Sequence, residues 1–139
     1  KIIKEGKKLA ILNFGARLNE TLKAAENLSK KGVPITVVDA RFAKPLDENL
    51  IWQLATTHEA IMTIEEGSIG GFGSHVVNFL TKKGLMDSNL KFRSLTLPDI
   101  FIDQDTPDKM YKVANLDSVS IEEKVLDLLN SNIVLKKQN

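Results

Sequence analysis

Residues 63–80 read TIEEGSIGGFGSHVVNFL, and they join an apolar segment to an amphipathic one through a glycine-rich turn. The apolar residues before the turn predict a buried strand over 60–64. After the turn, large apolar residues recur at helical spacing: Phe72, Val76, Phe79 and Leu80. A strand that runs through glycines into a helix is typical of α/β sheets and also of phosphate-binding loops. The same stretch therefore bears on both the fold and the function.

The rest of the chain repeats this alternation of strand and helix. Apolar or β-branched runs predict further strands at residues 9–14, 34–40 and 92–97, with the last near the edge of the sheet. We therefore predict one α/β domain over 9–130, a three-layer α/β/α sandwich with a mostly parallel sheet. Residues 1–8 are interpreted as a truncated linker and residues 131–139 as a polar, frayed tail.

Helix ends are marked by capping residues. We predict that Asn19 caps the first helix and that Asp47 caps a helix over 48–57. Ser120 and Glu123 have the spacing of a capping box at the start of the last helix. Each of these predictions fixes a boundary that the structure can test.

Composition limits the classes of function. The 139 residues include 19 basic and 18 acidic side chains, and the net charge of +1 gives no electrostatic reason to expect nucleic acid or a membrane as a partner. The absence of cysteine excludes disulfides and thiolate metal sites. No apolar run approaches the ~20 residues of a membrane helix, and no signal peptide is visible. We therefore expect a soluble, cytoplasmic protein, and because the chain starts at Lys1 rather than Met we expect a fragment.

The glycine turn matches a dinucleotide-binding fingerprint only in part. Gly71 and Gly73 occupy the first two glycine positions, but Val76 stands at the third. The acidic residue expected ~20 positions later at a strand end is missing, and no Walker-type lysine motif is present. We interpret the glycines as structural, required for positive φ and for close packing of the helix on the sheet.

Other polar residues also favour structural roles. Glu65 and Glu66 end a strand with side chains on opposite faces, so we expect one of them to brace a neighbouring backbone rather than to form an acid–base pair. His58 and His75 lack the further ligands of a zinc site. The connection DARFAKPLD at 39–47 predicts a salt-bridged corner, with Arg41 able to hold a carboxylate.

Four motifs together carry a family resemblance: LAILNFG at 9–15, VVDARFAKPLD at 37–47, TIEEGSIGGFGS at 63–74 and LPDIFIDQDTPDKM at 97–110. From about residue 6 to 129 the chain resembles the C-terminal domain of the 1-deoxy-D-xylulose-5-phosphate synthases, which are transketolase-like enzymes. The corner and the glycine motif are partly shared with the wider group, including the β-subunits of 2-oxoacid dehydrogenases. The segment LPDIFI narrows the resemblance to the synthases.

The resemblance implies a five-stranded mixed sheet in the third domain of a homodimeric enzyme. That enzyme converts pyruvate and glyceraldehyde 3-phosphate to 1-deoxy-D-xylulose 5-phosphate and CO2, a precursor for isoprenoid, thiamine and pyridoxal biosynthesis. Thiamine diphosphate and magnesium are bound by the N-terminal domains of the same polypeptide, so the resemblance implies no catalytic, cofactor or metal residue in this chain. We therefore expect the chain alone to be inactive.

The resemblance implies a structural or interface role for the positions that match the family motifs. These positions are Asp39, Arg41, Pro45, Asp47, Glu65, Glu66, Gly70, Gly71, Gly73, Pro98 and Asp99. Two alternatives stay open: a free-standing module that binds phosphate or nucleotide, and the C-terminal domain of a 2-oxoacid dehydrogenase β-subunit. The LPDIFI segment argues against the second.

Overall fold

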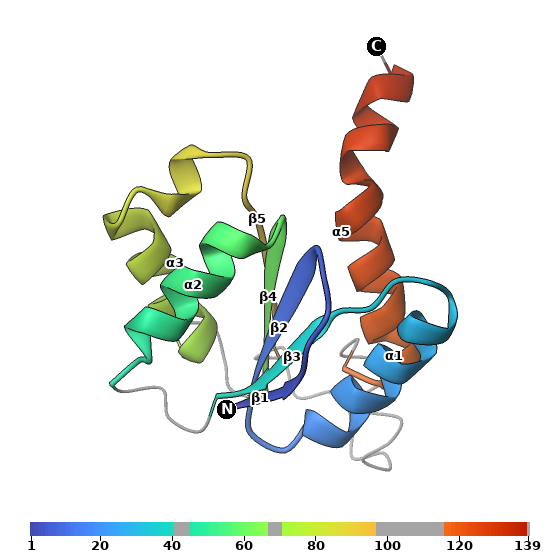
Figure 1. Cartoon of the computed structure of the whole chain (residues 1–139), viewed down its shortest axis with the longest axis horizontal. Helices are drawn as coiled ribbons and strands as arrows, with labels where there is room; N and C mark the ends of the chain where they lie inside the picture. Colours follow the sequence, from blue (N-terminus) through green and yellow to red (C-terminus); the bar gives the residue numbers. More distant parts are fainter. Residues whose placement is uncertain (41–44, 67–70, 97–115, 139) are drawn as a thin grey trace, which may run out of the picture.

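The computed structural model describes residues 1–40, 45–66, 71–96 and 116–138, the last of these through their backbone alone from residue 131 onward. Its described strands form one sheet in the order β1-β3-β2-β4-β5 (Figure 1). Strands β2 to β5 are parallel, and β1 is antiparallel to β3 at one edge. Their bounds are β1 Ile2–Lys4, β2 Leu9–Phe14, β3 Thr36–Asp39, β4 Ala60–Glu65 and β5 Lys91–Thr96.

The helices cover both faces of this sheet. Helices α1 and α5 pack on one face, and α2 and α3 pack on the other (Figure 1). The chain moves from β2 to β3 in one direction across the sheet and from β3 to β4 in the opposite direction. Because each crossover is right-handed, α1 and α2 lie on opposite faces. The predicted three-layer α/β/α fold with a five-stranded, mostly parallel sheet is confirmed. The helix bounds are α1 Leu18–Lys30, α2 Glu48–Thr57, α3 Phe72–Lys82 and α5 Ser118–Gln138, with a 3-10 turn η1 at Leu85–Asp87.

The central strands β2 and β4 are buried on both faces, which explains why their sequences are mostly apolar. Along β2, Leu9 and Ile11 face α1 and α5, whereas Ala10 and Leu12 face α2 and α3. Every residue of β4 is buried, including Glu65 at its end. Two apolar clusters, one on each face, therefore hold the sheet between its helices.

The segment interpreted as a linker contains strand β1. Ile2 and Lys4 pair with Val38 and Val37, with a register shift between them. Gly6 follows, and a Cβ at this position would lie 2.4 Å from the carbonyl carbon of Ile35, so the two backbones are in direct contact. Sequence periodicity does not reveal this strand, because it is three residues long and lies between the charged residues Lys1 and Glu5.

Two of the three predicted caps are wrong. Asp47 caps α2 as expected, because its Oδ1 accepts a hydrogen bond of 3.1 Å from the Leu50 N–H. Helix α1 begins one residue before Asn19, and its N-cap residue Arg17 makes no side-chain cap. Helix α5 begins at Ser118, where Asp117 Oδ1 accepts from the Ser120 N–H at 3.3 Å, so Ser120 is not the cap.

Helix α5 also continues further than predicted. It reaches Gln138, so most of the segment interpreted as a frayed tail is helical, and Figure 1 shows its distal half extending past the body of the domain. Within the described parts of the chain, no helix has both the length and the apolar character needed to cross a bilayer.

Polar contacts fix the first half of α5 to the domain. The Glu122 carboxylate is 7% exposed and accepts hydrogen bonds from Lys31 Nζ at 2.8 Å and Asn27 Nδ2 at 3.2 Å. On the other side, Lys91 Nζ donates to the Leu128 carbonyl at 3.0 Å. The hydrogen bond from Lys31 lowers the pKa of Glu122 below its ordinary value, against the opposing effect of burial.

This lowered pKa makes the docking of α5 dependent on pH. A carboxyl group whose pKa is lower in the folded chain stabilises it above the unfolded pKa of ~4.3, and that contribution is lost as the pH falls through the folded pKa. We predict that Glu122→Gln lowers the free energy of unfolding by about 1 kcal/mol at neutral pH, because Lys31 is largely exposed and screened. Thermal melts between pH 3 and pH 7 should show a weaker acid dependence in this variant. The exposed neighbour Glu123→Gln is the control, and equal acid dependence in the wild type and Glu122→Gln would refute the role of this carboxylate.

Candidate functional site

The parallel strands β2 to β5 end at the same side of the sheet, and the helices that follow β2 and β4 lie on its opposite faces. β2 leads into α1, whereas β4 leads toward α3 on the other side. In open α/β sheets, ligands bind in the crevice that such a divergence creates. The residues at this end of the sheet, 13–17 at and beyond the end of β2 and 65–66 at the end of β4, therefore form the candidate site.

Glu65 connects the end of β4 to the start of α3. Its side chain is buried, with 2% exposed, and its Oε1 accepts a hydrogen bond of 2.9 Å from the Phe72 N–H. Its Oε2 accepts from the Gly73 N–H. These amides belong to the first turn of α3, where the helix dipole favours negative charge and the N–H groups have no partner within the helix. The carboxylate thus takes the position that a bound phosphate would occupy at this helix start.

Gly73 allows α3 to lie directly against the sheet. A Cβ at this position would lie 2.4 Å from Ser94 Oγ and 2.8 Å from Thr63 Oγ1, distances that real Cβ atoms do not show. Those two hydroxyls hydrogen bond to each other across β4 and β5 at 3.1 Å. The expectation of close helix–sheet packing is therefore met at Gly73.

The expected positive φ at this turn is not found at Gly71. Its φ is −86°, outside the left-handed region, so its backbone does not require glycine on that ground. The described glycines with positive φ are Gly15, Gly32 and Gly84, which end β2, α1 and α3.

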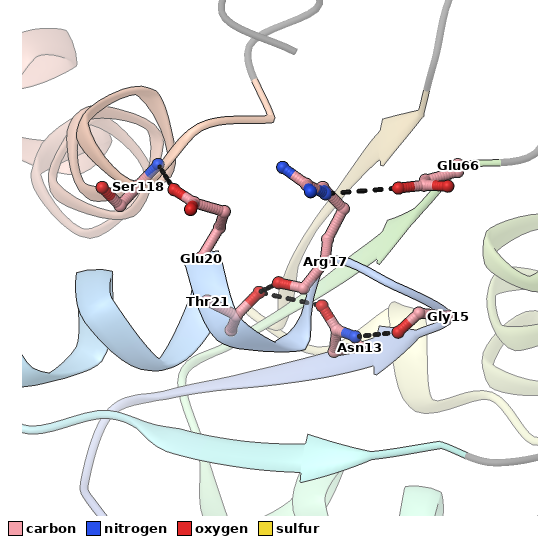
Figure 2. A network of polar contacts seen from close by, with 7 residues as sticks. All are labelled: Asn13, Gly15, Arg17, Glu20, Thr21, Glu66 and Ser118. Carbon is pink, nitrogen blue, oxygen red and sulfur yellow. Dashed lines mark hydrogen bonds and ion pairs between the residues drawn. The ribbon is translucent and has the colours of Figure 1, made fainter. Parts of the chain in front are cut away.

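Glu66 points away from Glu65 and forms an ion pair with Arg17, which follows β2. The Glu66 Oε1 lies 3.2 Å from Arg17 Nε, and the two side chains are 32% and 17% exposed. Figure 2 shows this ion pair bridging the loop after β2 and the end of β4. The prediction that the two glutamates serve opposite faces is confirmed, and Glu65 is the one that braces a neighbouring backbone.

Polar groups beneath Arg17 satisfy one another. The Asn13 side chain is fully buried at the end of β2, accepts from the Thr21 hydroxyl at 2.8 Å and donates to the Gly15 carbonyl at 3.2 Å (Figure 2). The same Thr21 hydroxyl also lies 3.0 Å from the Arg17 carbonyl, so its one proton is shared between the two acceptors. One turn along α1, the Glu20 carboxylate accepts from the Ser118 N–H at 2.9 Å at the start of α5 (Figure 2). The polar side chains at the ends of β2 and β4 thus make their contacts within the chain.

The corner after β3 is described in part. Asp39, Pro45 and Asp47 line one pocket of about 200 Å³, together with apolar residues that include Leu50 and Phe72. This volume is below the ~300–1,000 Å³ of most ligand pockets. The other predicted members of this corner and of the motifs lie outside the described residues: Arg41, Lys44, Gly70, Pro98 and Asp99.

The two histidines contact different parts of the domain. His58 follows α2 and contacts the Thr36 hydroxyl through Nε2 at 2.8 Å and the Leu54 carbonyl through Nδ1 at 3.0 Å. His75 lies in the first turn of α3, beside Asp47 and Lys82 in an open groove. Across the described ranges, no three His, Cys, Asp or Glu side chains are grouped so that they could hold a metal ion.

Comparison with known proteins places this architecture in a family. The family described as transketolase, C-terminal domain, matches residues 1–121, which is most of the chain. The chain belongs to the transketolase C-terminal domain family. Membership is consistent with thiamine diphosphate as the cofactor of full-length relatives.

A solved structure supports the same assignment. The protein described as "Split gene transketolase, inactive beta4 tetramer" is similar to this transketolase C-terminal domain, with a TM-score of 0.83 and 29% sequence identity. The match covers 94% of this chain and 42% of that protein. The chain therefore spans less than half the length of this relative.

The start of α3 in this transketolase C-terminal domain does not fit the diphosphate of thiamine diphosphate. The amides of Phe72 and Gly73 are bonded to Glu65, and a diphosphate brought to them would meet this buried negative charge.

Sequence reasoning missed Asn13, Arg17 and Thr21, although a polar residue inside the apolar run LAILNF was a usable signal for Asn13. Arg17 carried no such signal, because its partner Glu66 is distant in sequence.

The packing of Gly73 leads to a testable expectation for the stability of this domain. We predict that Gly73→Ala lowers the free energy of unfolding by about 1–3 kcal/mol, because the added methyl group overlaps Ser94 Oγ and Thr63 Oγ1. Adding Ser94→Ala removes the nearer atom and should recover part of the loss, measured by urea denaturation of the single and double variants. Additive losses in the double variant, or a Gly73→Ala variant as stable as the parent, would show that this contact does not constrain α3.

Proposed function

We propose that this chain is the C-terminal domain of a 1-deoxy-D-xylulose-5-phosphate synthase, in which it supports dimer assembly and active-site geometry without supplying catalytic groups. The observation that carries the supporting role is the Glu65 carboxylate on the first amides of α3. It closes the position at which a glycine turn of this kind would bind an anion. The choice of the synthase among transketolase-like enzymes is supported by the LPDIFI segment at 97–102, which lies outside the described residues.

In this proposal the chemistry belongs to other domains. Thiamine diphosphate and magnesium are bound by the N-terminal domains of the same polypeptide, and the partners of this chain are those domains and the second subunit of a homodimer. The proposed setting is the cytoplasm, with neither nucleic acid nor membrane as a partner. The near balance of 19 basic and 18 acidic residues supports the last point.

The two alternatives are less well supported. A free-standing phosphate or nucleotide module would need the α3 amides for its ligand, and Glu65 already accepts from the first of them at 2.9 Å. A 2-oxoacid dehydrogenase β-subunit shares the corner and glycine motifs but is disfavoured by LPDIFI. Neither alternative accounts for as many of the observations as the synthase does.

Domain grafting tests the proposal. The C-terminal domain of an active 1-deoxy-D-xylulose-5-phosphate synthase and that of a transketolase are each replaced by residues 1–139. We expect the synthase graft to form 1-deoxy-D-xylulose 5-phosphate within about tenfold of its parent, a loss of ~1.4 kcal/mol or less in transition-state stabilisation, and the transketolase graft to stay inactive.

Matched controls make the outcome decisive. Each parent without its C-terminal domain sets the background, and the isolated chain is assayed with pyruvate, glyceraldehyde 3-phosphate, thiamine diphosphate and magnesium. Activity in the transketolase graft alone would overturn the assignment to the synthase. Turnover by the isolated chain would overturn the non-catalytic role.

A further inference from the structure

The two outermost strands of the sheet, β1 and β5, differ in how their unpaired sides are protected. At one edge, β1 is three residues long and has a register shift against β3. At the other edge, β5 is six residues long and, within the described chain, pairs with β4 alone. A long open edge is a template for pairing with another strand, whereas a short and irregular edge is not. Within the described residues no strand pairs with the outer side of β5, so this edge needs a protecting feature if the domain is not to self-associate through it.

The backbone groups that point outward from β5 follow from its pairing with β4. The Lys91 N–H donates to the Glu59 carbonyl at 3.0 Å, so the backbone of Lys91 faces β4. Alternate residues of a strand direct their backbone groups to the same side. Phe92, Ser94 and Thr96 consequently direct their N–H and C=O groups toward the open edge.

Arg93 folds back over this edge. It is exposed, and its Nη1 donates a hydrogen bond of 2.8 Å to the carbonyl of Phe92, one of the outward acceptors. The other cation of the strand, Lys91, is held by the Leu128 carbonyl on α5. The positive charge that β5 presents along its edge is therefore that of Arg93.

We propose that Arg93 keeps the β5 edge closed to a second copy of this chain. Two β5 strands joined about a twofold axis would pair their outward residues with each other and extend the sheet. The Phe92 carbonyl would then have to give up the Arg93 donor, and the two Arg93 side chains would lie on the same face of the joined sheet as direct or diagonal neighbours. Like charges at such positions oppose strand pairing.

The test is a comparison of Arg93→Thr with Lys124→Thr in the full 139-residue chain. Threonine favours strands and removes both the carbonyl cap and the charge. Lys124 is an exposed cation on α5 that lines the same groove as Arg93, so its replacement removes an equal charge away from the edge. Arg93→Gln, which also removes the charge, provides a second variant in case Arg93→Thr does not fold, as judged by circular dichroism.

Sedimentation velocity over a concentration series and hydrogen–deuterium exchange of residues 91–96 give the result. We expect the Arg93 variants to self-associate about tenfold more tightly than the wild type, with new protection of the 91–96 amides, and Lys124→Thr to match the wild type. Unchanged association of the Arg93 variants would overturn the proposal. Association without protection of 91–96, or equal association of Lys124→Thr, would overturn it as well.

Discussion

The Glu65 carboxylate, bonded to the first two amides of α3, is the interaction on which the candidate site depends. It joins the last residue of β4 to the first turn of the helix that follows the glycine turn. Burial makes this contact strong, because the charge has little access to water and the helix start supplies N–H donors that would otherwise lack partners. The contact of Gly73 with Ser94 and Thr63 brings the helix close enough for the carboxylate to reach both amides.

The same interaction determines what the carboxyl edge of the sheet can do. In many open α/β sheets this edge binds a ligand, but here the positions that would receive it are taken by the protein's own groups. Glu65 occupies the helix start, the Arg17–Glu66 pair joins the loop after β2 to the end of β4, and the Asn13 side chain is bonded to Gly15 and Thr21. This arrangement agrees with the proposal that the domain supports a larger enzyme without binding the cofactor itself.

The sequence predicted the parts of the fold that depend on local periodicity. The strands after β1, the helix over 48–57 and its Asp47 cap follow from apolar spacing and turn residues, and the structure has them at nearly the predicted bounds. It did not predict β1, because three residues gain their strand conformation from pairing with β3 rather than from their own pattern. The bracing role of Glu65 followed from the alternation of strand side chains, whereas its acceptance of two α3 amides depends on how closely α3 packs on the sheet at Gly73. The Arg17–Glu66 pair depends on strand order, which brings together residues 49 positions apart (66 − 17).

The central claim is that the α3 amides are closed to anions by Glu65. It is tested most directly by recording the amide ¹⁵N–¹H spectrum of the chain while inorganic phosphate and thiamine diphosphate are added in separate titrations. The account predicts that the Phe72 and Gly73 resonances do not move in a saturable manner with either ligand, because both amides donate to the buried carboxylate. Saturable shifts centred on these two amides would contradict it and would restore the glycine turn as a phosphate-binding loop.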